Sequence, residues 1–255
     1  MTSPLKVWVE RDGHLLRLRL NRPKANIIDA EMIAALDDAL AQHADNAGLT
    51  AILLDAEGPH FSFGASVEEH LPEQCADMLK TLHALIRRMV EYPVPILVAI
   101  NGQCLGGGLE VAMAGHLLFA APEASLGQPE IAIGVFAPAA SCLLPERIGQ
   151  AQAEDLLYSG RSVSGTQAAS IGLINEAAAD PEAAALAWFD THLASKSASS
   201  LGCAVKAARA GFAERVCEKL EAVERLYIDE LMASRDALEG LTAFIEKRPA
   251  NWEHR

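Results

Sequence analysis

Three consecutive glycines directly before an apolar stretch constrain the fold of this chain most. The segment "NGQCLGGGLEVAMAGH", residues 101–116, follows the apolar run "PILVAI" and continues with a helical pattern. Glycine inside a helix costs roughly 1 kcal/mol relative to alanine, so three at a helix start must relieve crowding or expose backbone for use. The pattern predicts a strand, a turn and a helix whose first free N–H groups face a partial negative charge.

Glu110 lies three residues after Gly107, so on a helix the two share a face and a carboxylate lies near a backbone N–H donor. The segment has neither the G-x-x-x-x-G-K-[ST] nor the G-x-G-x-x-G spacing of nucleotide-binding loops. The Glu110 carboxylate would also repel a bound anion such as phosphate. A carbonyl that becomes an oxyanion during a reaction fits better. The alternative is close packing of the helix on a strand, with Glu110 complementing the helix dipole.

Two further stretches favour a ligand site. Residues 58–70, "GPHFSFGASVEEH", supply a second glycine-rich corner whose N–H groups could face a ligand. Residues 125–140, "SLGQPEIAIGVFAPAA", present Glu130 between Pro129 and an apolar run, which predicts a carboxylate in a largely apolar setting. A capping or solvated role for Glu130 is the alternative.

Short apolar runs alternate with amphipathic patterns over the first part of the chain. The expected elements are strands at 15–20, 51–55 and 95–100 and helices at 29–46, with Asp29 as N-cap, and at 74–92. This order predicts an α/β fold with parallel strand neighbours. From about residue 151 the pattern indicates helices only.

Charge and cysteine content argue against several classes of protein. The net charge is −13 and the 21 basic residues are scattered, so no nucleic-acid partner is expected. Five cysteines in no C-x-x-C pattern indicate neither a disulfide framework nor a zinc site. Without a basic start and a long apolar run, the N-terminal sequence predicts a cytoplasmic protein with no membrane segment.

Taken together, the stretches resemble the crotonase (enoyl-CoA hydratase/isomerase) superfamily over nearly the whole chain. The motifs that carry the resemblance are "LNRPKANIID", "FSFGAS", "NGQCLGGGLEVAMAGH", "ASLGQPEIAIGV" and "FIEKRPANW". The resemblance implies a spiral of ββα units over residues 1–195 that holds a coenzyme A thioester. It further implies a C-terminal helical region, 196–255, that assembles the chain into homotrimers or hexamers, the latter as dimers of trimers.

The resemblance also implies site residues. Ala65 and Gly107 would supply the two N–H groups of an oxyanion hole. Glu110 and Glu130 match the paired glutamates of the hydratases, and we assign Glu110 mainly to activating water and Glu130 mainly to proton donation. The implied coenzyme A contacts are Lys24, Ala25, Gly64, Ser66, Val67, Phe244 and Lys247.

Departures from the common family pattern point to one branch. Ser66 replaces a frequent Asp, and the glycine-rich segment expected after the second glutamate is absent, so Phe136, Ala137 and Pro138 would reshape the acyl pocket. These features resemble the cyclohexa-1,5-diene-1-carbonyl-CoA hydratases of anaerobic benzoyl-CoA degradation. The implied reaction is reversible hydration to 6-hydroxycyclohex-1-ene-1-carbonyl-CoA without metal or redox cofactor, coenzyme A being part of the substrate.

Two alternatives remain open at this point: a hydratase or isomerase for linear enoyl-CoA esters, and a non-catalytic scaffold that keeps the fold. Other residues receive plainer interpretations. We expect His60, His70 and His83 at loop or helix surfaces, and Cys104 as a small packing residue rather than a nucleophile.

Overall fold

A six-stranded sheet forms the centre of the molecule in a computed structural model, which describes residues 3–255. Its order is β1-β2-β3-β4-β6-β9, and all neighbours are parallel except β1 and β2. The strands are β1 (Leu5–Glu10), β2 (Leu15–Leu20), β3 (Ala51–Ala56), β4 (Ile96–Ile100), β6 (Leu117–Ala120) and β9 (Glu176–Ala177). The α/β class and the parallel neighbours predicted from the sequence are therefore confirmed.

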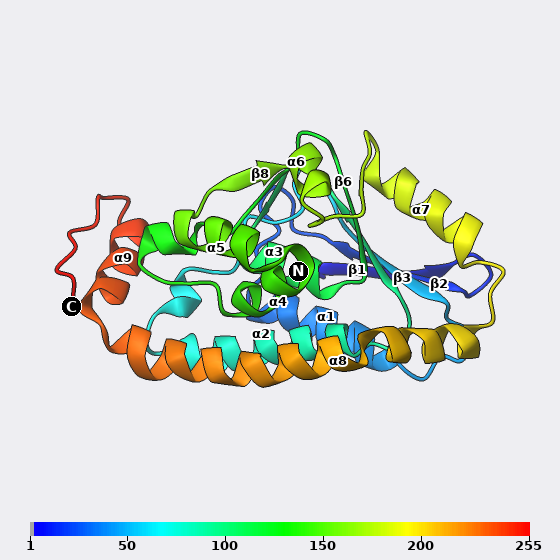
Figure 1. The fold of residues 1–255 in the computed structure, drawn as a ribbon, viewed down its shortest axis with the longest axis horizontal. Coiled ribbons are helices and arrows are strands. Elements are labelled where there is room, and N and C mark those ends of the chain that lie inside the picture. The colour runs from blue at the N-terminus through cyan, green and yellow to red at the C-terminus, as the bar shows by residue number, and fades with distance from the viewer. Residues whose placement is uncertain (1–2) are drawn as a thin grey trace.

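A second, three-stranded sheet runs beside the first and gives the chain a repeating path. It contains β5 (Gln103–Leu105), β7 (Ser125–Gly127) and β8 (Ser162–Ser164). The chain passes from β4 to β5 and into helix α3 (Gly107–Ala114), and then from β6 to β7 and into α4 (Pro138–Ile148). Strand, strand and helix thus repeat, as expected for a spiral of ββα units (Figure 1).

The expectation of helices alone beyond residue 151 is wrong. Helices α5 (Gln150–Ser159) and α6 (Gly165–Ser170) are present, but β8 and β9 extend both sheets in the same region. These strands are only three and two residues long, too short to show an alternation in the sequence.

Alternating side chains of the central strands build two cores, one on each face of the sheet. Leu53 and its neighbours pack against α7 (Pro181–His192), whereas Ile52 and Leu54 belong to the larger core. That core includes residues of α1 (Ala30–His43) and α2 (Cys75–Val90), the two helices predicted at 29–46 and 74–92. The Asp29 carboxylate accepts from Met32 N, which confirms the predicted N-cap.

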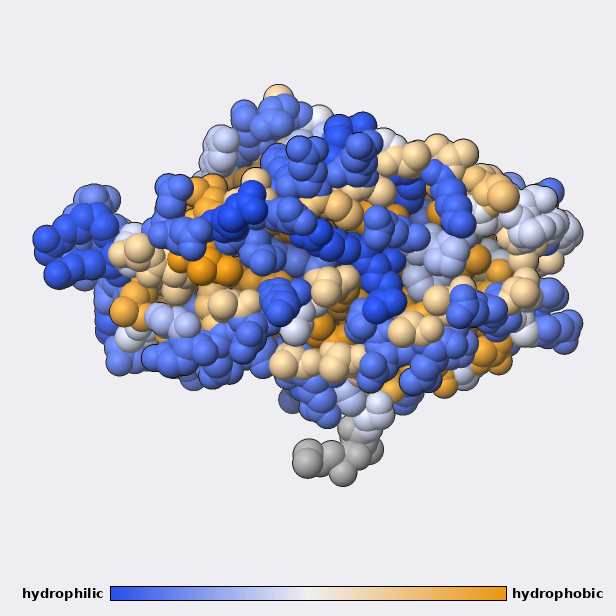
Figure 2. Space-filling view, turned by 90° about the horizontal axis from the view of Figure 1, so that it is seen from below, coloured by the Kyte–Doolittle hydropathy of each residue, from blue (hydrophilic) through white to orange (hydrophobic). Residues whose placement is uncertain are grey.

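The C-terminal part of the chain is helical. Helix α8 (Ala198–Arg225) runs along the lower side of the molecule in Figure 1 and packs against α2 and α4. It continues through a π-helical turn, Leu226–Glu230, and a 3-10 turn before α9 (Arg235–Ile245). Figure 2 shows this lower side as a mixture of hydrophilic and hydrophobic residues. The division at residue 195 stays a prediction.

Within residues 3–255, no helix has the length and apolar character needed to cross a lipid bilayer.

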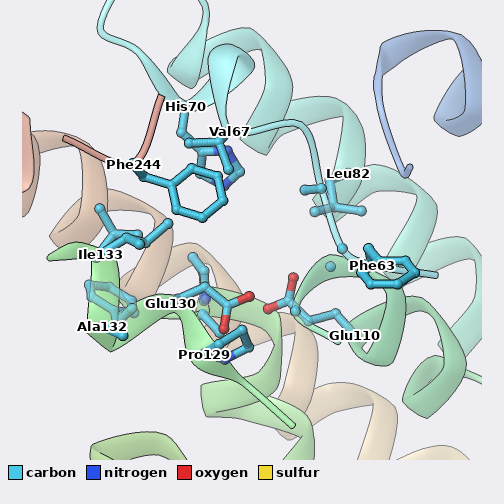
Figure 3. Close-up of a pocket in the computed structure, with 18 of the residues that line it drawn as sticks. Phe63, Val67, His70, Leu82, Glu110, Pro129, Glu130, Ala132, Ile133 and Phe244 are labelled. Atoms are coloured by element: carbon cyan, nitrogen blue, oxygen red, sulfur yellow. The ribbon is translucent and has the colours of Figure 1, made fainter. Parts of the chain in front are cut away.

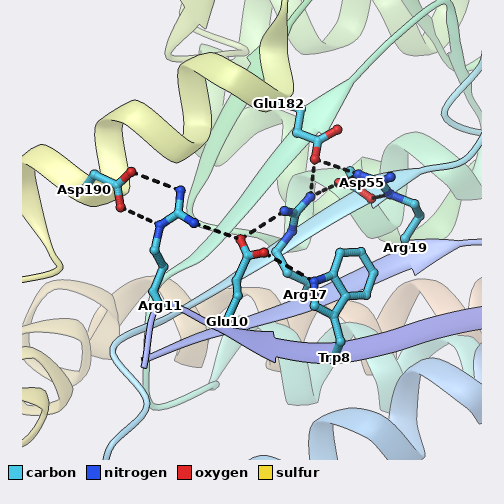
Figure 4. A network of polar contacts seen from close by, with 8 residues as sticks. All are labelled: Trp8, Glu10, Arg11, Arg17, Arg19, Asp55, Glu182 and Asp190. Carbon is cyan, nitrogen blue, oxygen red and sulfur yellow. Dashed lines mark hydrogen bonds and ion pairs between the residues drawn. The ribbon is translucent and has the colours of Figure 1, made fainter. Parts of the chain in front are cut away.

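A network of ion pairs attaches α7 to the sheet (Figure 4). The Arg17 guanidinium, with 3% of the residue exposed, donates to the carboxylates of Glu10, Asp55 and Glu182. Arg19 also contacts Asp55, so this buried carboxylate has two cationic partners. Such a buried pair is costly to break on one side, because the remaining charge stays in an apolar setting.

Replacing Arg17 by Met is therefore expected to destabilise the protein by about 2 kcal/mol, less than for an isolated buried pair because Arg19 still neutralises Asp55. The matched variant Arg11→Met removes the exposed pair with Asp190 and a longer contact of 3.9 Å with Glu10, and should cost below about 1 kcal/mol. Urea unfolding of both variants measures the difference. Equal losses would show that burial of Arg17 does not strengthen the network.

Candidate active site

A cavity of about 360 Å³ opens between the two predicted glycine-rich corners, α4 and the C-terminal helices. Its walls are mostly apolar, with leucine, valine, isoleucine, proline and phenylalanine side chains. The polar side chains on its walls are Glu110, Glu130 and His70. Figure 3 shows the two carboxylates facing each other across one end of this space.

Each glycine of the triplet allows a different close approach. A Cβ at Gly106, whose φ is +49°, would lie 2.3 Å from Glu130 Oε1. A Cβ at Gly107 would lie 2.9 Å from the Ala65 Cβ, and one at Gly108 would lie 2.5 Å from the Ser62 Cβ. The triplet therefore lets the start of α3 pack directly against one catalytic candidate and against the 58–70 corner.

The backbone N–H groups of Ala65 and Gly107 are brought together here. Two parallel bridges, Ile28 with Ala65 and Ser62 with Cys104, hold the corner beside the strand that precedes α3. Within residues 3–255, neither Ala65 N nor Gly107 N donates to another group, and both residues line the cavity. Two free donors on one wall of an apolar cavity can stabilise a carbonyl oxygen that gains negative charge.

Glu110 projects from the first turn of α3 and is 3% exposed. Its Oε1 accepts a hydrogen bond of 2.8 Å from Ala140 N, an N–H of the first turn of α4. Burial raises the pKa of Glu110 to about 7, although this hydrogen bond and one from the Ala139 backbone oppose the shift. The side chain thus has a fixed position and a proton affinity suited to work near neutral pH.

Glu130 lies in a one-turn 3-10 helix, Pro129–Ile133, and is half-buried. Burial and the nearby negative charge of Glu110 raise its pKa to about 8. The buried amide of Gln128, oriented with its nitrogen toward Glu130, donates to both carboxylate oxygens at 3.1 and 3.3 Å. The sequence interpretation missed Gln128, and its position two residues before Glu130 was the available signal.

The far end of α3 is anchored by two guanidinium groups. Arg147 of α4 donates to the carbonyl oxygens of Met113 and Gly115, and Arg209 of α8 donates to those of Ala114 and Gly115. Cations stabilise the carbonyl end of a helix. The contacts therefore hold α3, and with it Gly107 and Glu110, from two separate helices.

The other predicted site residues fall into three groups. Phe136, Ala137 and Pro138 all line the cavity, as do Gly64, Val67 and Phe244. Lys24, Ala25 and Ser66 lie instead along a separate surface hollow. Lys247 is exposed after α9 and lines neither space. All these roles stay predictions.

The expectation for the histidines needs correction. His83 is 1% exposed within α2, where its ring contacts Glu224 of α8, so its placement on a helix surface is wrong. His70 lines the cavity, and no feature of the surrounding sequence indicated this. Cys104 is fully buried, as expected for a packing residue.

The raised pKa of Glu130 has a consequence for stability. Between its ordinary value of 4.5 and about 8, the folded state retains a proton that the unfolded state releases, so stability falls as pH rises through this window. We expect Glu130→Gln to remove that loss and to raise Tm relative to the unmodified protein by at least about 2 °C at pH 9 but less at pH 5. Differential scanning calorimetry at both pH values measures the Tm difference, with the exposed variant Glu73→Gln as control. A Tm difference that does not change with pH would contradict the raised pKa of Glu130.

Comparisons with known proteins agree with this geometry. The profile of the enoyl-CoA hydratase/isomerase family matches residues 10–255. A cyclohexa-1,5-dienecarbonyl-CoA hydratase of Thauera aromatica is 68% identical over 254 residues, covering 100% of this chain and 98% of the relative.

Solved structures show the same fold. An enoyl-CoA hydratase/isomerase from Pseudoalteromonas atlantica T6c superposes with a TM-score of 0.84 at 29% identity, covering 98% of this chain and 99% of that one. An enoyl-CoA hydratase from Mycobacterium avium subsp. paratuberculosis K-10 has a TM-score of 0.86 at 22% identity, covering 99% of each chain. From its profile match and its 68% identical relative, the chain belongs to the enoyl-CoA hydratase/isomerase family.

Proposed function

We propose that the protein hydrates a cyclic dienoyl-CoA thioester, converting cyclohexa-1,5-diene-1-carbonyl-CoA reversibly to 6-hydroxycyclohex-1-ene-1-carbonyl-CoA. The observation that carries the proposal is the pair of carboxylates, Glu110 and Glu130, facing each other in an apolar cavity beside two free backbone donors. The Thauera aromatica relative, named for hydration of this thioester, supports the choice of acyl group.

The chemistry of the diene dictates where water adds. Of the two double bonds, C1=C2 is conjugated with the thioester so that C2 is the electrophilic carbon. Attack of water oxygen at C2 moves the electron pair toward the thioester oxygen and gives a dienolate. Protonation at C5 then leaves the double bond between C1 and C6, and renumbering gives the 6-hydroxy-1-ene product. Ala65 N and Gly107 N would stabilise the oxygen that carries the charge.

The two carboxylates suit different steps. Glu110, held by Ala140 N, would accept a proton from the attacking water, and Glu130, whose pKa is raised by burial and by the charge of Glu110, would supply the proton to C5. Gln128 would hold the Glu130 carboxylate in place. Hydration is redox neutral and the carboxylates carry the proton transfers, so the proposed reaction needs neither metal nor redox cofactor.

The coenzyme A portion would extend from the cavity toward the surface. Lys24, Ala25 and Ser66 line a hollow beside the 58–70 corner, while Phe244 lines the cavity from α9. We propose that these residues, with Gly64, Val67 and Lys247, contact coenzyme A. Lys247 would do so from a neighbouring subunit in an assembled trimer.

The proposal includes assembly into trimers or hexamers and a cytoplasmic location. Large hydrophobic side chains are exposed on α9 and after it, among them Leu238, Phe244 and Trp252, and a second subunit would cover them. The odd number and scattered positions of the cysteines support a reducing compartment. Light scattering that gives a monomer mass would contradict the assembly.

The decisive experiment compares initial hydration rates for cyclohexa-1,5-diene-1-carbonyl-CoA and crotonyl-CoA under identical conditions, followed by loss of diene or enoyl absorbance. A kcat/KM preference for the cyclic diene is the expected result. Preference for crotonyl-CoA would assign the protein to linear enoyl-CoA esters. No turnover of either substrate would favour the isomerase or scaffold alternatives.

Phe136 is expected to contribute to the cyclic preference, because its ring lines the cavity and packs against Tyr227 with centroids 5.2 Å apart. Phe136→Ala should lower the cyclic-to-linear ratio of kcat/KM by roughly tenfold, since about 1–3 kcal/mol of shape selectivity is typical of an apolar wall. Phe212→Ala, on α8 outside the cavity, is the control for general loss of packing. An unchanged ratio would remove Phe136 from substrate selection.

A further inference from the structure

His70 is the one polar side chain of the cavity, within residues 3–255, that the proposed proton transfers do not use. It ends the one-turn 3-10 helix Glu68–His70, which forms the last three residues of the 58–70 corner. Figure 3 shows it beside Val67 and Phe244, across the cavity from Glu110 and Glu130. A polar group on an otherwise apolar wall calls for a partner.

The hydrogen bonding of the ring determines what His70 offers to the cavity. Nδ1 lies 2.7 Å from the Ser66 carbonyl oxygen, and because a carbonyl only accepts, Nδ1 must carry the hydrogen. Burial lowers the pKa of His70, so the ring is neutral near pH 7. Nε2 consequently presents a lone pair and acts as an acceptor.

Within the described chain, Nε2 has no protein partner to donate to it. The ring is also held in place: Tyr227, fully buried, packs beside it with centroids 6.5 Å apart. The cavity walls beside the ring are apolar side chains, so an occupant of the cavity can supply the donor for Nε2. A rigid acceptor in such a place discriminates strongly between occupants with and without a donor.

We propose that His70 Nε2 binds a hydroxyl group on the acyl portion of the thioester and so makes His70 a specificity residue for hydroxylated ring acyl groups. The inference rests on the proposed function, in which every turnover places such a hydroxyl in the cavity. Attack by water leaves one of its two protons on the product oxygen. Glu110 takes the other proton, so the product hydroxyl keeps a hydrogen that it can donate to His70 Nε2.

Binding of unreactive aromatic thioesters tests the assignment without requiring turnover. Calorimetric Kd values would be measured for benzoyl-CoA, for 2-, 3- and 4-hydroxybenzoyl-CoA, and for the three matching methoxybenzoyl-CoA esters. We expect one hydroxy isomer to bind up to about tenfold more tightly than both benzoyl-CoA and its methoxy counterpart, because only a hydroxyl can donate to Nε2.

Two variants separate the acceptor from the volume of the side chain. His70→Leu should reduce the hydroxyl advantage to less than about twofold while benzoyl-CoA binds as before. His70→Gln, whose Oε1 can accept at a similar reach, should restore part of the advantage. Circular dichroism of both variants checks that they fold.

The outcomes distinguish this inference from the proposed function. If benzoyl-CoA binds but none of its hydroxy isomers binds more tightly, or if the advantage persists in His70→Leu, the role of His70 is overturned and the thioester site stands. If none of the seven esters binds, the thioester site itself is overturned together with this role.

Discussion

Glu110→Gln and Glu130→Gln are each expected to lower kcat by about 10²–10⁴ while leaving Kd for a thioester within a few fold, because each removes a positioned acid or base and keeps the shape of the cavity. The two carboxylates face each other in the cavity, and their pKa values are raised to about 7 and about 8. Glutamine preserves size and the acceptor for Ala140 N but cannot exchange a proton.

The measurement is kcat with the cyclic dienoyl-CoA, paired with calorimetric binding of benzoyl-CoA. Glu68→Gln, an exposed carboxylate close to the cavity wall, is the matched control and should turn over normally. The double variant should lose little more than the worse single variant, because groups that act together are not additive. Turnover near the normal rate in either single variant would remove that residue from the mechanism.

Gly107→Ala is expected to lower kcat by about 10²–10³, the usual loss for one oxyanion donor. The added methyl carbon would lie 2.9 Å from the Ala65 Cβ and 3.1 Å from Ala65 N, so the two proposed donors would be forced apart. Since alanine favours a helix more than glycine does, helix formation itself should not suffer. The damage should therefore concentrate on the carbonyl site.

Gly211→Ala on α8 is the matched control, because its methyl carbon would meet only the mobile end of Arg215 at 3.1 Å. It should keep full turnover and show equal or higher Tm. Transition-state charge is best probed by comparing kcat/KM with the Kd of benzoyl-CoA in both variants. If Gly107→Ala loses binding and turnover in equal proportion, the glycine serves packing and not the oxyanion.

Local sequence patterns predicted the elements that depend on neighbouring residues, such as alternating strands and capped helices. Strand β2 has the bounds expected from its alternation, and α1 begins after the Asp29 cap. The glycine triplet predicted a helix whose first amides are free, and within residues 3–255 one of them, Gly107 N, has no acceptor and belongs to a residue that lines the cavity. Strands β8 and β9 were not predicted, because these short strands form by pairing with segments that are distant in the sequence.

Residues that matter through long-range contacts were harder to predict. The inward position of His70 depends on the packing of Tyr227, 157 positions later in the chain, and of Phe244 beyond it. Likewise, the role of Gln128 depends on an amide orientation set by the carboxylate it meets. Neither arrangement leaves a periodic or compositional signal. By contrast, local sequence context singled out Glu110 and Glu130, and the family resemblance then paired them as catalytic residues.

In the proposed complex, backbone amides would contact the thioester oxygen and side chains would form the wall around the acyl group. Backbone amides such as those of Ala65 and Gly107 persist through most substitutions, whereas Phe136 and His70 can be exchanged one at a time. Most side-chain substitutions therefore leave the two amides that activate the carbonyl in place. New acyl specificities are then accessible by single mutations that leave thioester activation in place, a short evolutionary route from one ring or chain to another.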